Sequence, residues 1–351
     1  MSSGTAVVGQ TMLECKTPTF CKRNETMKFA RNVASLVTTA SLLAIAGVAF
    51  CQQTYPTRPI RIISPYAPGG GNTIMARLVA QKLTEAWGHQ VIVDNRPGGN
   101  TIIGTELTAR ATPDGYTFLL AGSSHVLTPL LLKTPYDPIK DFAPVGTVGK
   151  QENIMAASPS APFNDLRQLI AFAKSKPGQL NYATYGAGTS SHLSTELFCQ
   201  LAGIRMQHIP YKGAGPAITE LLGGQVQVFL STPAPVIPHI QSGRLKGIAI
   251  SGEHRAPAVP NLPTFAEAGL PGFESKGWYG LVAPAAAPRP IVDKVSAEMA
   301  RFLAAPDIKK FLNAQGVEPF ISTSEQFAAL MKSDNAKWIR VIKGSNIKLE
   351  N

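Results

Sequence analysis

Two glycine-rich segments hold the residues whose types and spacing could bind a small anion. The first, PYAPGGGNT, places three glycines before Asn72 and Thr73, and the second, NYATYGAGTSSH, covers 181–192. Each lies between a strand-like run and a helix-like run, and consecutive glycines suit a backbone that a ligand approaches closely. Helix N-termini at the carboxyl ends of strands offer free N–H groups and a positive dipole end. We therefore predict that backbone amides at both corners hold an anion.

Other chemistries are less well supported at these corners. GAGTSS has Ser191 in place of the third glycine of a dinucleotide fingerprint, and no acid follows about 20 residues later. No Gly-Lys-Ser/Thr of a P-loop follows either corner. The six histidines are scattered without HxxxH or HExxH spacing, which predicts no metal site. In NRPGG, Arg96 could meet a carboxylate or lie on the surface of a turn.

The adjacent Ser190, Ser191 and His192 leave a second chemistry open. A secreted serine hydrolase is an alternative, although the nucleophile elbow GxSxG is absent. The two serines could instead cap a helix, alone or while also donating a hydroxyl to a carboxylate. These two roles are compatible.

Composition and charge restrict the class of protein. The chain has 351 residues, 44% hydrophobic and 16% charged, which is enough for two globular domains with sizeable cores. The net charge is +11, and because residues 1–51 hold five basic and two acidic residues, +8 remains in 52–351. The charges are scattered and no basic run is interleaved with aromatics, which argues against nucleic acid. A moderate basic excess suits the capture of small anions.

The N-terminal segment resembles a secretory signal. Lys28 and Arg31 precede an apolar run over 33–50, which is short for a membrane span. Cleavage after Ala49 or after Cys51 fits the small-residue rule, so residues 1–51 are the predicted leader. A start at Met27 would make 1–26 an extension that precedes it. A lipoprotein anchor at Cys51 is disfavoured by the bulky residue before it.

One cysteine is left after the predicted leader. Cys199 lies inside an apolar helix pattern, where we expect a buried, inert thiol. A single cysteine can form neither a disulfide framework nor a cysteine-based metal site.

Strand-like and helix-like patterns alternate along the rest of the chain. This predicts a parallel sheet with helices on both faces. The expected strands are 59–64, 89–95, 115–121, 152–158, 180–184, 206–210, 226–230 and 245–251, and the expected helices are 73–87, 164–175, 191–202, 216–222, 290–303 and 324–342. Asn72, Ser190 or Ser191, and Asn164 are the predicted helix caps, and the helix from 164 should bury Leu166, Leu169, Ile170 and Ala173.

Several runs together resemble a known family. They include YPTRPIRIISPYAPGGGNTIMARLVAQKL, KPGQLNYATYGAGTSSHLSTELF, IPYKGAGPAITELLGGQVQV and WYGLVAPAAAP, and the likeness covers nearly all of 55–345 in order. The chain resembles the Bug family, the extracytoplasmic solute receptors of tripartite tricarboxylate transporters. The resemblance implies an α/β fold of the type II periplasmic-binding-protein kind, with two Rossmann-like lobes joined by two crossing strands around a ligand cleft. It implies binding rather than catalysis, and no cofactor.

The resemblance also implies domains, location and partners. Lobe 1 would comprise 52–151 plus 272–351 and lobe 2 would comprise 152–271, with links near Asn153 and Phe273. The protein would be a periplasmic monomer that presents a small carboxylate to the membrane subunits of a transporter. A ligand-sensing receptor for a signalling partner is the alternative that the sequence cannot separate.

The family's ligand-binding positions carry over onto three parts of this chain. The expected ligand-binding residues are Ala67, Pro68, Gly69, Gly70, Gly71, Asn72 and Thr73 in the first corner, Ser123 and Ser124 after the strand at 115–121, and Gly188, Thr189, Ser190, Ser191, His192 and Ser231 in the second lobe.

The chain departs from the family pattern at two acidic positions. The family's first loop commonly continues from its glycines to an aspartate, where this chain has Asn72 and Thr73. A second common aspartate, after VQV, is Ser231 here. An aspartate can accept from a ligand ammonium, so its loss argues against an amino acid. We expect a carboxylate without an ammonium group.

Overall fold

Two β-sheets organise the chain, which passes from one to the other and back. The computed structural model describes Thr5 and residues 55–345. The predicted leader, its cleavage sites at Ala49 and Cys51 and a start at Met27 lie outside the described residues. Among the described residues, no helix has the length and apolar character needed to cross a membrane.

The first sheet has six strands, and its outer strands come from distant parts of the chain. Its order is β11 (Val317–Pro319), β4 (Phe142–Glu152), β10 (Lys276–Pro284), β3 (Thr117–Gly122), β1 (Ile60–Ser64) and β2 (Val91–Asn95). Strand β1 pairs in parallel with β2 and β3, in a register that sets Ile62 opposite Val93 and Phe118. Strand β10 runs antiparallel to β3 and β4.

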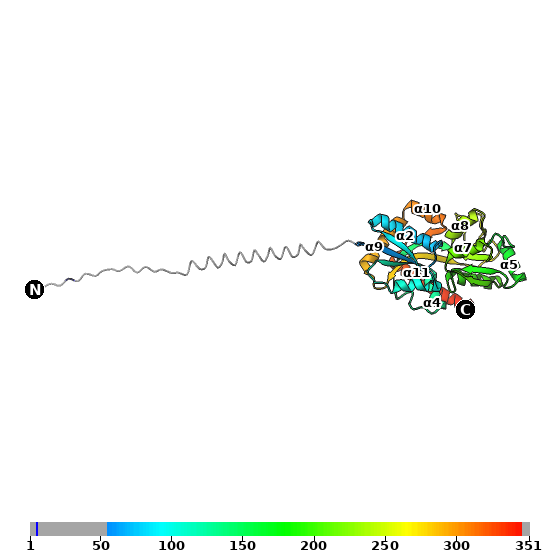
Figure 1. Cartoon of the computed structure of the whole chain (residues 1–351), viewed down its shortest axis with the longest axis horizontal. Coiled ribbons are helices and arrows are strands. Elements are labelled where there is room, and N and C mark those ends of the chain that lie inside the picture. Colours follow the sequence, from blue (N-terminus) through cyan, green and yellow to red (C-terminus); the bar gives the residue numbers. More distant parts are fainter. Residues whose placement is uncertain (1–4, 6–54, 346–351) are drawn as a thin grey trace. The chain divides into compact units, whose positions relative to one another are not determined.

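Alternating side chains of β1 and β3 build a core on each face of this sheet. Ile60 and Ile62 pack on the face covered by α2 (Gly71–Trp87), α9 (Arg289–Leu303) and α10 (Pro306–Ala314). Ile63 and Leu119 pack on the face covered by α4 (Ser124–Leu131) and α11 (Ser324–Ser345). The short η1 (Gly99–Thr101) and α3 (Ile102–Ala109) connect β2 to β3. In Figure 1, α2 and α9 flank the blue strands and α11 lies below them.

The second sheet has five strands and is built in the same way. Its order is β7 (Gln207–Pro210), β6 (Asn181–Thr184), β8 (Val228–Ser231), β5 (Ile154–Ala157) and β9 (Lys246–Ile250). Helices α5 (Leu166–Ser175) and α6 (Ser190–Ala202) contribute to the core on one face. Helices α7 (Ala214–Leu222) and α8 (Pro233–Gln241) contribute to the core on the other. Helices α5, α7 and α8 surround the green strands in Figure 1.

The prediction of parallel sheets is wrong, because both sheets are mixed. Strand β5 runs antiparallel to β8 and β9, and β11 runs antiparallel to β4. Strands β5 and β10 break the parallel pattern and lie next to the passages between the sheets, whereas β11 follows α10 at the outside of the first sheet. A crossover through a helix gives parallel neighbours, whereas β5 and β10 enter directly from the other sheet and run antiparallel to their neighbours.

The two passages between the sheets lie side by side and are hydrogen-bonded to each other. Asn153 connects β4 to β5, and the segment 251–275 leads back from β9 to β10. The Asn153 N–H donates to Ser251 Oγ at 2.8 Å, and the Ser251 N–H donates to the Asn153 carbonyl at 2.8 Å. The Asn153 amide also donates to Ser275 Oγ at 2.6 Å, and Ser275 Oγ donates to Ser194 Oγ at 2.7 Å.

The predicted helix caps are wrong in detail, and their side chains tie other parts of the chain together. Asn72 lies inside α2, where its side chain accepts from Ser64 Oγ and donates to the Leu120 carbonyl. Ser191 Oγ accepts from the Tyr185 N–H. Helix α5 is capped by Asp165, one residue after Asn164. Its stripe buries three of the four expected residues, with Ile170 half-buried.

Candidate functional site

A pocket of about 40 Å³ lies between the two sheets, next to the strands β4 and β10 that connect them. Its lining comes from strands and loops of the first sheet, from loops and helix starts that follow strands of the second sheet, and from Asn153 of the first passage. All of these residues belong to the part of the chain that the structure describes. They are Tyr66, Gly70, Gly71, Asn72, Gly122, Ser123, Gln151, Asn153, Tyr185, Ser190, Ala214, Thr232, Lys276, Gly277, Trp278 and Tyr279.

Five helices begin at this pocket. The lining includes the first residues of α2, α6 and α7, which are Gly71, Ser190 and Ala214, and the N-cap residues of α4 and α8, which are Ser123 and Thr232. None of these five N-termini has a side-chain cap or an acidic residue in its first turn. A helix N-terminus carries a partial charge of about +0.5, so their convergence favours an anion.

Three tyrosines, of which Tyr185 and Tyr279 are buried and Tyr66 is half-buried, add neutral hydroxyls to the lining. Burial raises the pKa of Tyr66, Tyr185 and Tyr279, so each stays a protonated phenol that can donate a hydrogen bond. The Tyr66 and Tyr185 rings meet edge-on with centroids 5.9 Å apart. The Tyr185 hydroxyl is held by Ser231 Oγ at 3.2 Å and by the Thr232 N–H. The Tyr279 hydroxyl has no hydrogen-bond partner among the described residues.

Contacts across the pocket hold the two sides together. The Ala67 N–H donates to the Lys212 carbonyl at 2.8 Å. The Ser124 hydroxyl accepts from the Ser190 N–H at 3.0 Å and lies 3.2 Å from Ser190 Oγ, to which it donates. Ser124 therefore satisfies one of the free N–H groups of α6 from the opposite side of the pocket. Because these bonds span the two sides, opening the cleft would break them.

The glycines of the first corner are required by close contacts with β10 of the first sheet and with the helix starts of the second lobe. A β-carbon at Gly71 would overlap the Tyr279 hydroxyl and lie 2.9 Å from Thr232 Oγ1. A β-carbon at Gly70 would lie 3.3 Å from that of Ala214, and one at Gly215 would overlap the Pro68 carbonyl. The start of α7 therefore leaves little space for a side chain on Gly70 and none for one of its own on Gly215 beside the corner PGGG.

The predicted binding residues divide into those at the pocket and those behind it. Gly70, Gly71, Asn72, Ser123 and Ser190 line it. The remaining predicted residues do not line it but support its wall or join its two sides: Ala67, Pro68, Gly69, Thr73, Ser124, Gly188, Thr189, Ser191, His192 and Ser231.

The supporting residues have identifiable tasks. Thr73 Oγ1 accepts from the Asn95 amide at 2.9 Å, which joins α2 to the end of β2. Thr189 Oγ1 donates to the Gly186 carbonyl at 2.7 Å and shapes the turn before α6. Ser231 Oγ takes the Tyr185 hydroxyl and so positions a residue that does line the pocket.

His192 is buried behind the second corner and is neutral. Its Nδ1 accepts from the Gly188 N–H at 3.1 Å, and its ring stacks on His208 with centroids 3.8 Å apart. Burial, together with the neighbouring His208, lowers the pKa of His192 to about 3. Its Nδ1 is therefore committed to the turn at Gly188.

The same contacts bear on the hydrolase alternative. A serine nucleophile needs a hydrogen bond from its hydroxyl to the imidazole base. Ser190 Oγ accepts from Ser124, and Ser191 Oγ accepts from the Tyr185 N–H. Within residues 55–345, neither hydroxyl is hydrogen-bonded to His192, so this geometry does not form the required pair.

Eleven of the lining residues were missed by the sequence prediction: Tyr66, Gly122, Gln151, Asn153, Tyr185, Ala214, Thr232, Lys276, Gly277, Trp278 and Tyr279. Five of these, Gln151, Asn153, Tyr185, Thr232 and Tyr279, come from four separate segments. The sequence could have pointed to two of them from their neighbours alone, because Tyr185 lies inside the second corner and Thr232 follows the strand that ends at Ser231. Gln151 and Tyr279 lie on β4 and β10, whose pairing brings them to the pocket.

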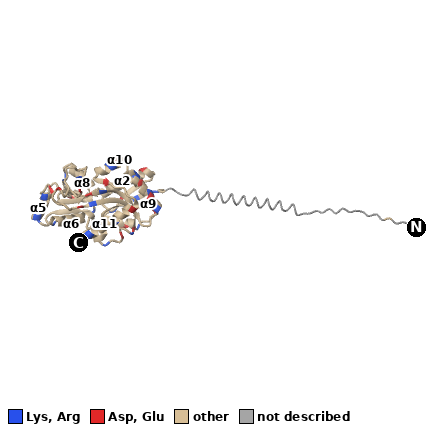
Figure 2. Cartoon of the chain, turned by 180° about the vertical axis from the view of Figure 1, so that it is seen from behind, with Lys and Arg blue, Asp and Glu red and all other residues tan. Residues whose placement is uncertain are grey.

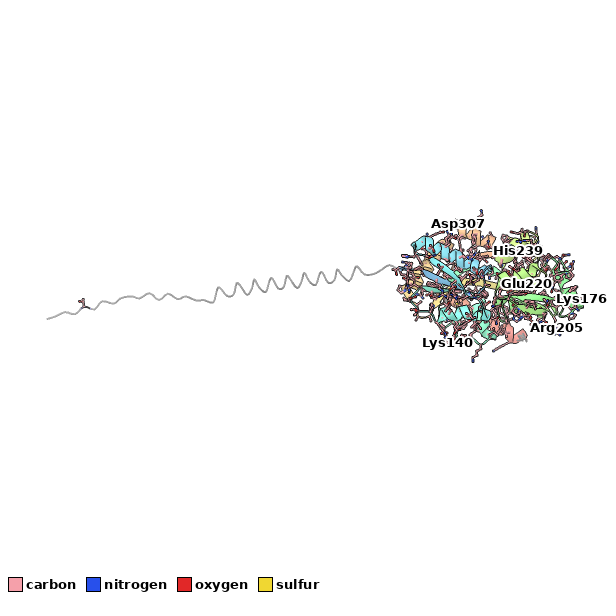
Figure 3. All side chains as sticks on the ribbon, viewed as in Figure 1. Lys140, Lys176, Arg205, Glu220, His239 and Asp307 are labelled. Carbon is pink, nitrogen blue, oxygen red and sulfur yellow. The ribbon has the colours of Figure 1, made fainter. Side chains whose placement is uncertain are left out.

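The charged residues around the pocket are already paired with one another. The Lys276 ammonium lies 2.9 Å from Glu253 and 3.9 Å from Glu152. Arg96, at the other candidate turn, pairs with Asp94 at 3.0 Å on the surface. Figure 2 shows blue and red residues interspersed along the ribbon. Lys140, Lys176 and Asp307 lie at the periphery in Figure 3.

The described residues form neither a metal-binding group nor an exposed thiol. Among the described residues, no three His, Cys, Asp or Glu side chains are grouped to hold a metal ion. Cys199 is buried in the second lobe, and burial raises the pKa of its thiol. As predicted, the thiol is buried.

Comparison with known proteins gives a consistent family. The profile described as the tripartite tricarboxylate transporter family receptor matches residues 75–347. Protein BugT of Bordetella pertussis is 36% identical over 313 residues, which cover 88% of this chain and 96% of BugT.

Two solved structures from Rhodopseudomonas palustris are similar over the same length. Rpa4515 with adipate is 31% identical with a TM-score of 0.82, covering 84% of this chain and 99% of that one. MatC with bound malate is 30% identical with a TM-score of 0.78, covering 82% and 100%. These matches confirm the resemblance found in the sequence and the two-lobed binding-protein fold. The chain belongs to the receptor family of the tripartite tricarboxylate transporters, a family of periplasmic solute-binding proteins.

Proposed function

We propose that this receptor captures a small carboxylate in the pocket and presents it to the membrane subunits of a tripartite tricarboxylate transporter. The observation that carries the proposal is the convergence of five helix N-termini without side-chain caps on one pocket. A carboxylate has acceptor oxygens only, so free N–H groups and neutral tyrosine hydroxyls suit it. The Lys276 ammonium is taken up by Glu253, so the attraction comes from dipoles.

The relatives' ligands support a carboxylate as the class. One solved relative holds adipate and another holds malate. We extend the class to this chain, and with it the expected binding positions at both corners. The lobe boundaries, 52–151 plus 272–351 and 152–271, belong to the same proposal.

We propose that the ligand acts by stabilising the closed arrangement of the two lobes. The bonds from Ala67 to Lys212 and from Ser124 to Ser190 exist only while the lobes are closed. A ligand shifts closure only by binding the closed state better than the open one. The membrane subunits would then recognise the closed receptor. Removal of residues 1–51 on export is part of the proposal, and mass measurement of the exported protein tests it.

The experiment is a thermal-melt screen of residues 52–351 against small carboxylates, amino acids and aromatic acids. A ligand present at about 100 times its Kd adds about 2.7 kcal/mol. For a protein of this size that raises the Tm by several degrees. A Gly71→Ala variant, whose added methyl group overlaps the Tyr279 hydroxyl, should lose the shift.

The outcomes separate the proposal from its rivals. A shift with one carboxylate class, lost in Gly71→Ala, supports it. A flat panel for folded protein shown by native mass spectrometry to be empty contradicts it. Turnover of ester substrates by the same preparation, abolished by Ser190→Ala, would support the hydrolase instead.

A further inference from the structure

Two buried polar groups of the pocket lining have no hydrogen-bond partner among the described residues. They are Oε1 of Gln151 and the hydroxyl of Tyr279. The residues are only 6% and 4% exposed. Buried polar atoms are nearly always hydrogen-bonded, and leaving one unpaired is unfavourable. Two such atoms in the lining of one pocket suggest that the ligand supplies the missing partners.

The strands place these two groups on one face of the first sheet. Gln151 on β4 is paired with Gly277 on β10, and Tyr279 lies two residues further along β10. Residues two apart on a strand share a face, and such diagonal neighbours are about 7–8 Å apart. One small molecule can therefore contact both.

Two glycines, Gly277 and Gly71, leave the space that the Gln151 amide and the Tyr279 hydroxyl occupy. A β-carbon at Gly277 would lie 2.8 Å from Gln151 Nε2, so glycine leaves space for the amide. The Tyr279 hydroxyl lies against Gly71, the first residue of α2. Tyr279 thus stands at the predicted carboxylate grip, and Gln151 lies toward the passage between the lobes.

Neighbouring charges do not satisfy either group. Lys276, which also lines the pocket, is paired with Glu152 across the same two strands, one residue before Gly277 and one after Gln151. The Lys276 ammonium binds Glu253 at 2.9 Å. The lining of the pocket contains no Asp or Glu.

The chemistry of the missing partners follows from the two groups. A phenol hydroxyl beside a helix N-terminus donates to a carboxylate oxygen. An amide oxygen accepts, so it needs a donor on the ligand, either a hydroxyl or an ammonium. Five converging helix N-termini and a lining without acids disfavour an ammonium. A hydroxyl remains.

We propose that Gln151 and Tyr279 form a specificity subsite for a ligand that carries a hydroxyl group beside its carboxylate. Tyr279 donates to the carboxylate, and Gln151 accepts from the hydroxyl. This assignment rests on the proposed function, carboxylate capture, and narrows the ligand to hydroxycarboxylates.

The test compares acids that differ by one hydroxyl on the folded protein, residues 52–351. Isothermal calorimetry is done with malate against succinate, 3-hydroxybutanoate against butanoate, and mandelate against phenylacetate. For at least one pair the hydroxy acid should bind roughly 10- to 100-fold more tightly, the range for leaving a buried polar group unpaired. Aspartate should bind less tightly than malate.

Three variants assign the preference to the subsite. Gln151→Met keeps the side chain's length without the amide, and should reduce the preference to less than about 3-fold. Gly277→Ala leaves Gln151 in place but pushes its amide aside, and should do the same if Gln151→Met fails to fold. Tyr279→Phe should weaken both members of a pair by a similar factor, because both carry the carboxylate.

The outcomes separate this inference from the function beneath it. Equal binding of hydroxy and parent acids overturns the subsite and leaves carboxylate capture standing. A preference that survives both Gln151→Met and Gly277→Ala also overturns it. If no carboxylate binds to the folded, empty protein, the proposed function fails and the subsite with it.

Discussion

Replacing Gly215 by alanine should separate the stability of the second lobe from closure of the cleft. Gly215 is the second residue of α7, with a helical backbone, and a β-carbon there would overlap the Pro68 carbonyl of the opposite lobe. If the lobes separate as proposed, Pro68 moves away from Gly215 and the overlap is removed. Alanine also favours a helix over glycine by up to about 1 kcal/mol.

The magnitude follows from the overlap. Pro68 lies in the first corner, which the Ala67–Lys212 hydrogen bond holds against the start of α7, so the backbone cannot move away without breaking that bond. Inserting a methyl group into close-packed surroundings costs about 1–3 kcal/mol. If this penalty applies only to the closed state, ligand affinity falls about 5- to 150-fold. The Tm without ligand should stay the same or rise.

The assay is calorimetric titration with the ligand identified by the melt screen, alongside thermal melts without ligand. Gly223→Ala is the matched control, because Gly223 ends the same helix and an added β-carbon there makes only ordinary contacts. The control should bind like the natural protein. If Gly215→Ala also binds like the natural protein, the contact of Pro68 with Gly215 is not part of the ligand-bound state and the reasoning fails.

Three further perturbations test other parts of the site. Ser124→Ala and Ser190→Ala should each weaken ligand binding up to about 10-fold. A double-mutant cycle should give about 1 kcal/mol of coupling, since Ser124 bonds both the N–H and the hydroxyl of Ser190. Additive losses would contradict a role for the Ser124–Ser190 hydrogen bonds in binding. Burial lowers the pKa of His192 to about 3, below its value near 6.5 in the unfolded chain. Between these two pH values unfolding takes up a proton, so the contribution of neutral His192 to the free energy of unfolding is full above pH 6.5 and is lost as the pH falls toward 3. His192→Asn keeps an acceptor for the Gly188 N–H, and chemical denaturation at several pH values should show a slope smaller by up to about 1.4 kcal/mol per pH unit; an unchanged slope would assign the acid sensitivity elsewhere. Asp334→Ala should lower the free energy of unfolding by about 1–3 kcal/mol, because it leaves the Trp278 indole N–H without its acceptor at 2.9 Å, whereas Asp334→Asn should be nearly neutral; equal losses in both would mean that the carboxylate charge matters instead.

The sequence pattern predicted eight of the strands and six of the helices that the structure describes. It missed the helices α3, α4, α8 and α10, the short β11, and the connecting strands β4 and β10. Strands such as β1 and β3 are short apolar runs next to glycine corners, and they could be recognised alone. Strand β4 contains Pro144, Gly146 and Gly149 and ends in Lys150–Glu152, which breaks any apolar alternation. Its strand conformation comes from pairing with β10, more than 120 residues later. No local pattern can express that pairing.

A similar limit applies to β10, whose glycines reduce its resemblance to a strand. A β-carbon at Gly280 would overlap the Phe327 ring, so glycine is there to admit an aromatic side chain of α11. Glycine normally weakens a strand, and it is kept where another group approaches closely. The reason for a glycine at position 280 is therefore Phe327, which is 47 positions away in the chain.

The errors in helix capping bear directly on how the pocket works. The sequence predicted Asn72 as the N-cap of α2 and either Ser190 or Ser191 as the N-cap of α6, because such residues commonly occur at helix N-termini. In the fold Asn72 bonds to Ser64 and Leu120, and Ser191 bonds to Tyr185, so both side chains hold neighbouring segments in place. Neither helix is therefore capped by its own N-cap residue, although the Ser190 N–H of α6 is bonded to Ser124 Oγ. A cap supplied by the N-cap residue would compete with an anion for the same N–H groups, so its absence at the pocket is what a carboxylate needs.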